Sequence, residues 1–225
     1  PVFYAKDVKA SLVFCSLTKY IAGHGNVLGG AVIDTGNYDW TKFSNLKPAY
    51  QVADTAQWGI TQIKKKGLRD LGATLAPQSA TAIALGMETL DLRLSRSQHN
   101  AMQLATFLDN HPKVSKVFYP GLADHPQHFM AREYLNDGYG AILSFDLIDG
   151  ADPVAFLNEM KLVICATHLG DNRTLALPVA PTIYFENTAE ERELMGISDT
   201  MLRISVGIED TQDLIADFDT ALNTI

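Results

Sequence analysis

Short strand-like and helix-like segments alternate along the second half of the chain, and this order limits the folds that the chain can adopt. Strand composition occurs at VSKVFYP, GAILSFDL, KLVICATHL and MLRISVGI, and helical composition at QHFMAREYLND, PVAFLNEM and TQDLIADFDTAL. Segments this short must bury their apolar faces against one another. We therefore expect helices on one face of a small, mostly antiparallel sheet.

The first half has fewer elements, separated by glycine and proline. SLVFCSLTKY and GNVLGGAVID have strand composition, and residues 54–66 form a helical pattern. Apolar residues at helical spacing then predict one long helix, with room for a bend, that ends before residue 111. Because GLRDLGATLAP is rich in helix breakers, we place a domain boundary near Pro77, which gives regions 1–77 and 78–225.

The composition suits a compact protein and argues against two classes of partner. The 225 residues are 47% hydrophobic, enough for a sizeable core, and the formal charge is −8. An acidic chain does not suit general nucleic-acid binding, which relies on clustered Lys and Arg. No run approaches the roughly 18 apolar residues of a membrane-spanning helix, and the amino end lacks the pattern of a signal peptide. We expect no nucleic acid, no membrane and a cytoplasmic location.

The sequence does not predict a metal site or a disulfide. Cys15 and Cys165 each lie in an apolar strand-like run, so we interpret both as small buried hydrophobes. His125 and His128 have a spacing that suits a metal, but no third or fourth ligand accompanies them.

SLTKYIAGHG places a lysine at the end of an apolar run. In a strand, Ser16 and Thr18 share one face until the chain turns, and two hydroxyls at a strand end suit a phosphate. Gly23 and Gly25 allow a sharp turn and close approach to a ligand. In a partly buried pocket, desolvation favours the neutral amine of Lys19, which can attack a carbonyl to form a Schiff base. The alternative is an ordinary surface lysine.

LRISVGIED places Arg203 between apolar neighbours in a strand, where its guanidinium needs an anion. A structural carboxylate is one candidate, and Glu209 and Asp210 are nearby in sequence. The other is the α-carboxylate of an amino acid, which matches the planar fork of arginine.

The lysine motif, S-x-T-K-Y-x-x-G-H-G, resembles the pyridoxal phosphate attachment motif of the Cys/Met-metabolism (transsulfuration) enzymes. That family includes cystathionine γ-synthase, cystathionine lyases, methionine γ-lyase and O-acetylhomoserine sulfhydrylase. The resemblance covers nearly the whole chain, since other segments follow in family order: LGATLAPQSATAIALGMETLDLR, VFYPGLADHPQH, HLGDNRTLALP and LRISVGIED. One departure is Ser11, where an acidic residue is usual.

The resemblance implies an α/β fold of the fold-type I PLP-dependent transferases, with part of a large domain followed by a smaller α+β domain. It implies that Lys19 holds pyridoxal 5'-phosphate covalently and that Ser16 and Thr18 bind its phosphate. Once a substrate amine displaces it, Lys19 becomes the general base and acid. Arg203 would bind the substrate carboxylate.

HLGDNRTL resembles a loop that lines the substrate pocket in the same enzymes. His168 stands where many members have serine or asparagine, and its side chain or the neighbouring backbone would help to hold the carboxylate. A packing role for His168 is the alternative. By the same likeness Thr174 would lie near this pocket.

The implied reaction is γ-replacement or γ-elimination on sulfur amino acids or O-acyl-homoserine, of the O-acetylhomoserine sulfhydrylase or cystathionine γ-synthase type. The alternatives are a cystathionine or methionine lyase of the same family, or a non-catalytic assembly domain that retains the fold. The family also implies a homotetramer built from dimers and a complete enzyme with more residues at the amino end.

Overall fold

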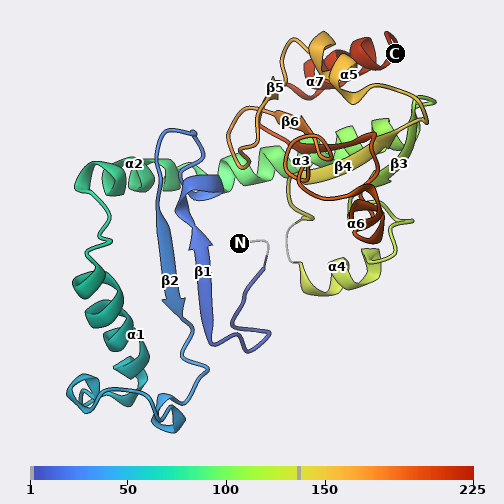
Figure 1. The fold of residues 1–225 in the computed structure, drawn as a ribbon. Helices are drawn as coiled ribbons and strands as arrows, with labels where there is room; N and C mark the ends of the chain where they lie inside the picture. The colour runs from blue at the N-terminus through green and yellow to red at the C-terminus, as the bar shows by residue number, and fades with distance from the viewer. Residues whose placement is uncertain (1–2, 136–137) are drawn as a thin grey trace.

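The structure, a computed structural model, describes residues 3–135 and 138–225. A two-stranded antiparallel hairpin, β1 (Leu12–Ser16) and β2 (Gly30–Asp34), lies apart from the larger carboxy-terminal sheet (Figure 1). Its register pairs Leu12 with Asp34 and Ser16 with Gly30. Both strands form where strand composition predicts them, but the first ends at Ser16, before the lysine.

The helical pattern over residues 54–66 is confirmed, although little of it is regular α-helix. Asp54 caps the segment, since its side chain accepts from the Ala56 backbone N–H at 3.0 Å. Helix α1 (Trp58–Gln62) continues into the wider helical turns of Ile63–Arg69. The short helical turns of this region are Trp40–Lys42, Pro48–Tyr50 and Thr55–Gln57.

The predicted single long helix is two helices, α2 (Pro77–Met87) and α3 (Leu90–Asp109). The break follows from side-chain hydrogen bonding at Thr89, whose hydroxyl donates to the Gly86 carbonyl at 3.4 Å and accepts from Arg93 Nε at 3.1 Å. Such bonds compete with the helical backbone pattern. The two helices lead from the hairpin into the carboxy-terminal part (Figure 1).

A five-stranded sheet with the order β3-β4-β7-β6-β5 forms the centre of the carboxy-terminal part. All neighbours are antiparallel except β5 and β6, which confirms a mostly antiparallel sheet within an α/β fold. The strands are β3 (Val114–Phe118), β4 (Ile142–Leu147), β5 (Ile164–Cys165), β6 (Leu175–Pro178) and β7 (Met201–Ser205).

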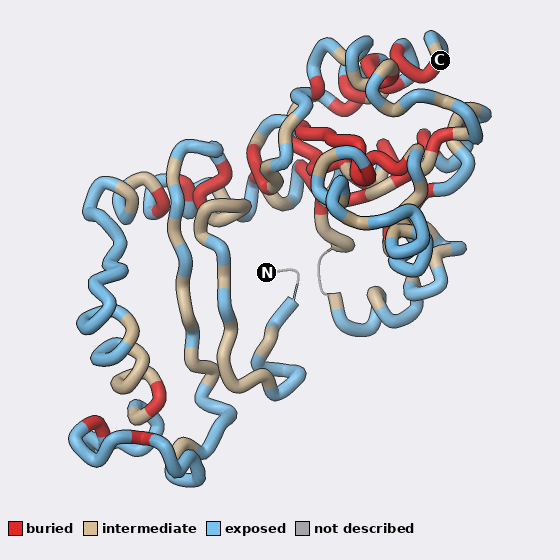
Figure 2. Tube along the Cα trace, viewed as in Figure 1, coloured by how far each residue is buried: buried red, intermediate tan, exposed pale blue. Residues whose placement is uncertain are grey.

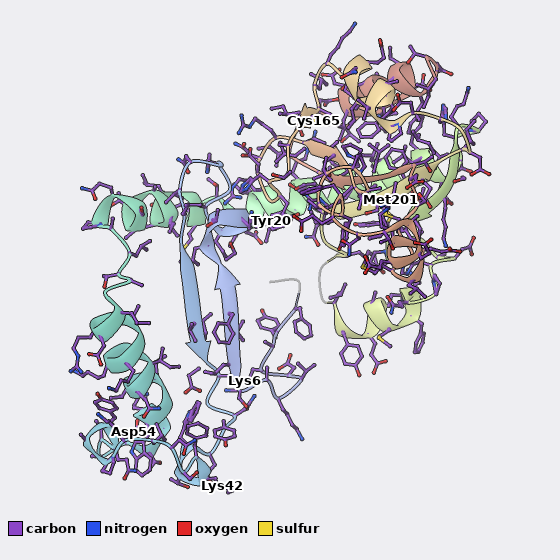
Figure 3. All side chains as sticks on the ribbon, in the orientation of Figure 1. Lys6, Tyr20, Lys42, Asp54, Cys165 and Met201 are labelled. Atoms are coloured by element: carbon purple, nitrogen blue, oxygen red, sulfur yellow. The ribbon has the colours of Figure 1, made fainter. Side chains whose placement is uncertain are left out.

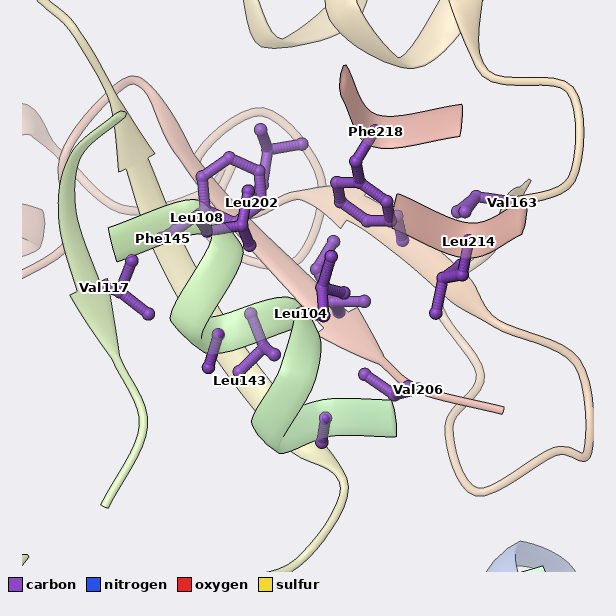
Figure 4. Packing of buried hydrophobic residues seen from close by; sticks show 14 of the residues in the cluster. Leu104, Leu108, Val117, Leu143, Phe145, Val163, Leu202, Val206, Leu214 and Phe218 are labelled. Atoms are coloured by element: carbon purple, nitrogen blue, oxygen red, sulfur yellow. The ribbon is translucent and has the colours of Figure 1, made fainter. Parts of the chain in front are cut away.

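Three helices cover one face of this sheet and bury the main core (Figure 2, Figure 4). They are α3, α5 (Pro153–Glu159) and α7 (Thr211–Leu222). Phe145 of β4 packs against Phe156 and Phe218 with ring centroids 5.9 and 6.3 Å away, and all three are fully buried. The other face has a smaller cluster around Leu177 and Met201. The remaining helices are α4 (His128–Tyr134) and α6 (Ala189–Leu194).

Two expectations are corrected in this half. The strand predicted over KLVICATHL has only two paired residues, and Cys165, expected to be buried, is exposed because β5 is an edge strand. Cys15 is half-buried, and both thiols are free. Strand β6 and helix α6 were not predicted, since LALP is short and AEEREL is mostly charged and shows no apolar stripe. Within the described residues, no helix combines the length and apolarity of a membrane crossing.

Candidate active site

The chain turns sharply after β1, and Lys19 lies in the middle of this turn. Lys19 departs from helical geometry, with φ −86° and ψ −129°, inside the turn Leu17–Ile21. The Thr18 hydroxyl accepts from the Gly29 N–H at 2.9 Å and donates to the Gly29 carbonyl at 3.2 Å. Thr18 therefore ties the turn to the residue before β2. Ser16, at the strand end, is exposed.

A buried arginine on α3 holds the far side of the lysine turn. Arg93 donates from Nη1 to the Tyr20 carbonyl at 2.9 Å and from Nη2 to the carbonyls of Ile21 and Gly86 at 3.2 and 2.7 Å. Burial lowers the pKa of its guanidinium, and backbone carbonyls, rather than a carboxylate, face its charge. Figure 3 shows Tyr20 at this junction of β1 with the α2 and α3 helices.

Sequence reasoning missed Arg93. The available signal was its place in the stripe that α3 buries, which also contains several apolar residues. The buried residues of α3 are Arg93, Ser97, Asn100, Ala101, Leu104, Ala105 and Leu108.

The loop after β5 docks directly on the lysine turn. Gly170 has φ +74°, and a Cβ added there would lie 2.7 Å from the Tyr20 backbone nitrogen, so only glycine fits. Its N–H donates to Ser205 Oγ at 2.8 Å, and the Asn172 N–H donates to the Gly23 carbonyl at 2.9 Å. These contacts fix the loop between the lysine turn and β7.

This docking brings His168 to Lys19, although the two are 149 residues apart in sequence. Lys19 Nζ and His168 Nδ1 are 3.1 Å apart. A lysine ammonium can only donate, so Nδ1 accepts and the imidazole proton lies on Nε2. Burial and the Lys19 charge lower the pKa of His168.

Arg203 lies on β7 and faces the same site. Its strand neighbours Leu202 and Ile204 are fully buried in the main core, so alternation turns Arg203 to the opposite face. Nη2 donates to the carbonyls of Thr167 and His168 at 2.9 and 3.2 Å. Burial lowers the pKa of the guanidinium.

The structural carboxylates considered for Arg203 are engaged elsewhere. Glu209 accepts from the Thr174 hydroxyl at 2.7 Å and from the Thr174 N–H. Asp210 caps α7 by accepting from the Gln212 N–H at 2.9 Å. Thr174 is fully buried and also accepts from the Gly207 N–H at 2.9 Å. The structure thus uses the Thr174 hydroxyl to join the docked loop to the end of β7.

Three buried polar atoms at this site lack a hydrogen-bond partner among the described residues: Tyr20 Oη, His168 Nε2 and Arg203 Nε. Burial raises the pKa of the Tyr20 phenol, which keeps it neutral. Buried polar groups are costly to leave unpaired. His168, whose Nδ1 lies 3.1 Å from Lys19 Nζ, and Arg203, which donates to the His168 carbonyl, therefore indicate a place beside the lysine for a polar ligand with acceptor groups.

Comparison with known proteins identifies the family. The family model described as "Cys/Met metabolism PLP-dependent enzyme" matches residues 3–223. The chain belongs to this family. Homocysteine synthase of Schizosaccharomyces pombe is 38% identical over 96% of the chain, and L-methionine gamma-lyase of Fusobacterium nucleatum subsp. polymorphum is 39% identical over 96%.

A solved structure shares the fold over 99% of the chain. It is a putative O-acetylhomoserine (thiol)-lyase from Campylobacter jejuni that contains N'-pyridoxyl-lysine-5'-monophosphate, with a TM-score of 0.87 and 30% identity. The chain covers 56% of that structure and 53% and 50% of the two relatives. It therefore spans about half the length of the proteins that it matches, and its predicted fold class is confirmed.

The residues at the site fit pyridoxal 5'-phosphate, the cofactor of the family. When bound, the cofactor supplies an aldehyde for an amine and a ring that withdraws electrons from a carbanion. The Lys19 amine meets the first need, and the unpaired donors of His168 and Arg203 suit anionic groups. The Thr18 hydroxyl both accepts a hydrogen bond from the Gly29 N–H and donates one to the Gly29 carbonyl. To donate to a phosphate, it would have to turn away from that carbonyl.

Proposed function

We propose that the complete protein is a pyridoxal 5'-phosphate-dependent enzyme that catalyses γ-replacement on O-acyl-homoserine or a related sulfur amino acid, with Lys19 as the attachment point. The observation that carries this proposal is the Lys19 amine, half-buried in the turn that follows β1 and 3.1 Å from His168, with Arg203 beside the same loop. These residues come together in a chain of the pyridoxal phosphate family.

Each proposed role follows from the position of the residue. Lys19 Nζ, once released by an incoming substrate amine, takes the proton from the substrate α-carbon and returns it at another carbon. Arg203 Nε, buried and unpaired among the described residues, donates to the substrate α-carboxylate. Ser16 and Thr18 bind the cofactor phosphate. We propose no substrate contact for the Thr174 hydroxyl, because Glu209 and Gly207 engage it.

The balance between replacement and elimination rests on the relatives. A homocysteine synthase and an O-acetylhomoserine (thiol)-lyase support replacement, whereas a methionine gamma-lyase supports elimination. We favour replacement, with a cystathionine or methionine lyase as the second candidate.

The test is an assay of the complete protein with O-acetylhomoserine plus sulfide, beside cystathionine and methionine. We expect the first pair to give homocysteine fastest, and Arg203→Met to raise KM for O-acetylhomoserine far more than Arg173→Met, which alters an exposed arginine paired with Asp171. Turnover of none of the three substrates would refute the substrate assignment. Turnover of methionine alone would favour the lyase.

A non-catalytic assembly domain is the other class of function. The buried polar atoms of His168 and Arg203 that have no partner among the described residues disfavour it, because a site without a ligand gains nothing from them. A small amino-acid substrate and a dimer of dimers belong to the proposal because the family resemblance implies them, and a cytoplasmic location belongs to it as the sequence pattern predicts. Light scattering on the complete protein tests the assembly.

A further inference from the structure

His168 departs from the serine or asparagine that is common at its position, and its side chain meets the reactive amine rather than a packing partner. Lys19 Nζ lies 3.1 Å from His168 Nδ1, within normal hydrogen-bond range. The backbone of His168 is held on both sides. Arg203 donates to its carbonyl at 3.2 Å, and two residues later Gly170 donates to Ser205 at 2.8 Å.

The imidazole is therefore presented to Lys19 from a fixed backbone, whereas the lysine side chain can rotate. A lysine held in one conformation has already lost the rotamer freedom that it must lose when it becomes attached to a cofactor. Protonation of the imidazole would remove the acceptor, since both ring nitrogens then donate. It would also place two positive charges about 3 Å apart, and their repulsion favours rotation of the lysine away from the site.

We propose that His168 is a positioning residue for Lys19: the neutral imidazole holds the amine inside the site through Nδ1, and protonation of the imidazole releases it. This inference rests on the proposed function of Lys19 and adds a pH-sensitive control of that residue.

The charges around the imidazole favour its neutral form at neutral pH. Burial and Lys19 lower the pKa of His168, Arg173 acts in the same direction, and Asp171 opposes them. Asp171 is itself paired with Arg173 at 3.0 Å. Arg203, which donates to the His168 carbonyl, adds a further positive charge.

The first experiment adds pyridoxal phosphate to the complete protein after its cofactor has been removed. Absorbance, and borohydride trapping with peptide mapping, then measure how much attaches to Lys19. His168→Asn can still accept a hydrogen bond but does not titrate, whereas His168→Leu does neither. At pH 8 we expect wild type and His168→Asn to attach alike and His168→Leu to attach about three- to tenfold more weakly. As the pH falls below about 6.5 and through the lowered pKa of His168, wild type should lose several-fold more attachment than His168→Asn. His99→Asn, which alters an exposed histidine on α3, is the matched control and should follow wild type.

Attachment at Lys19 that is equal in all variants, with one common pH profile, would overturn the role of His168 and leave the proposed function standing. A complete failure of wild type to attach cofactor would instead refute the proposed function.

The second experiment needs no cofactor. Nitrogen-15 NMR of the imidazoles should show His168 with its proton on Nε2 and with a titration midpoint below the ordinary value of about 6.5, because burial and the Lys19 charge lower its pKa. Lys19→Met should move the His168 midpoint upward, because it removes a positive charge. An unchanged midpoint would show that the two side chains do not interact and would overturn the proposal.

Discussion

Arg93 makes the sharpest prediction about how the site is built, because it ties the lysine turn to α2 and α3 through backbone carbonyls. Arg93→Met removes the only hydrogen-bond donor found for the carbonyls of Tyr20 and Ile21 within the described residues. The Gly86 carbonyl keeps the Thr89 hydroxyl at 3.4 Å.

The expected cost follows from these contacts. Two partly buried carbonyls left without a donor cost about 1 kcal/mol each, so we expect a loss of about 2 kcal/mol in the free energy of unfolding. Arg96→Met is the matched control, since Arg96 is exposed on the same helix and donates to the Glu209 carbonyl at 3.1 Å. It should cost less than about 1 kcal/mol.

The assay is denaturant unfolding of the complete protein, together with pyridoxal phosphate attachment at Lys19 under conditions in which the variant remains folded. We expect Arg93→Met to weaken attachment as well as stability, because the turn that carries Lys19 loses its anchor. The reasoning would be refuted if Arg93→Met were as stable as Arg96→Met, or if it lost stability without any change in attachment.

The other predictions concern the docked loop, the two hydroxyls and the pH dependence of stability. A side chain in left-handed backbone geometry costs roughly 1–2 kcal/mol in the free energy of unfolding. Gly170→Ala should cost well over this amount, because its Cβ would also meet the Tyr20 backbone nitrogen at 2.7 Å. Gly196→Ala, where φ is +72° and the space is open, should cost only the backbone component in the same unfolding assay. Thr18→Val should weaken both stability, by about 1 kcal/mol, and phosphate binding, whereas Ser16→Ala should weaken only phosphate binding; equal stability losses would contradict the Gly29 contacts. Because the folded pKa of His168 is lowered, the unfolded chain takes up its proton first, so stability should fall as pH drops below about 6.5 and level off below the folded pKa. His168→Asn should lose this component and His99→Asn should keep it, and identical curves for both would refute it.

Local patterns predicted the elements whose own residues determine them. β7 shows strand alternation, with Leu202 and Ile204 in the core and Arg203 on the opposite face. The amphipathic helix α7 begins at Thr211, behind its Asp210 cap. In both cases the signal lies within one segment, so periodicity was enough.

Contacts between distant segments decided what the patterns did not predict. The break between α2 and α3 depends on Thr89 bonding to Gly86, and a Cβ on Gly86 would meet the Ala22 carbonyl at 2.2 Å. The pairing of His168 with Lys19 depends on how a loop docks, which no spacing reveals. Thr174 was expected near the substrate pocket, but the position of Glu209 determines what its hydroxyl bonds.

The central claim is that Lys19 carries the cofactor. Borohydride reduction of the complete protein with pyridoxal phosphate bound, followed by digestion and mass spectrometry, tests it directly. The account predicts a phosphopyridoxyl group on the peptide that contains Lys19 and none on the peptide that contains the exposed Lys65. Bound cofactor with an unmodified Lys19, or with the label on another lysine, would contradict it.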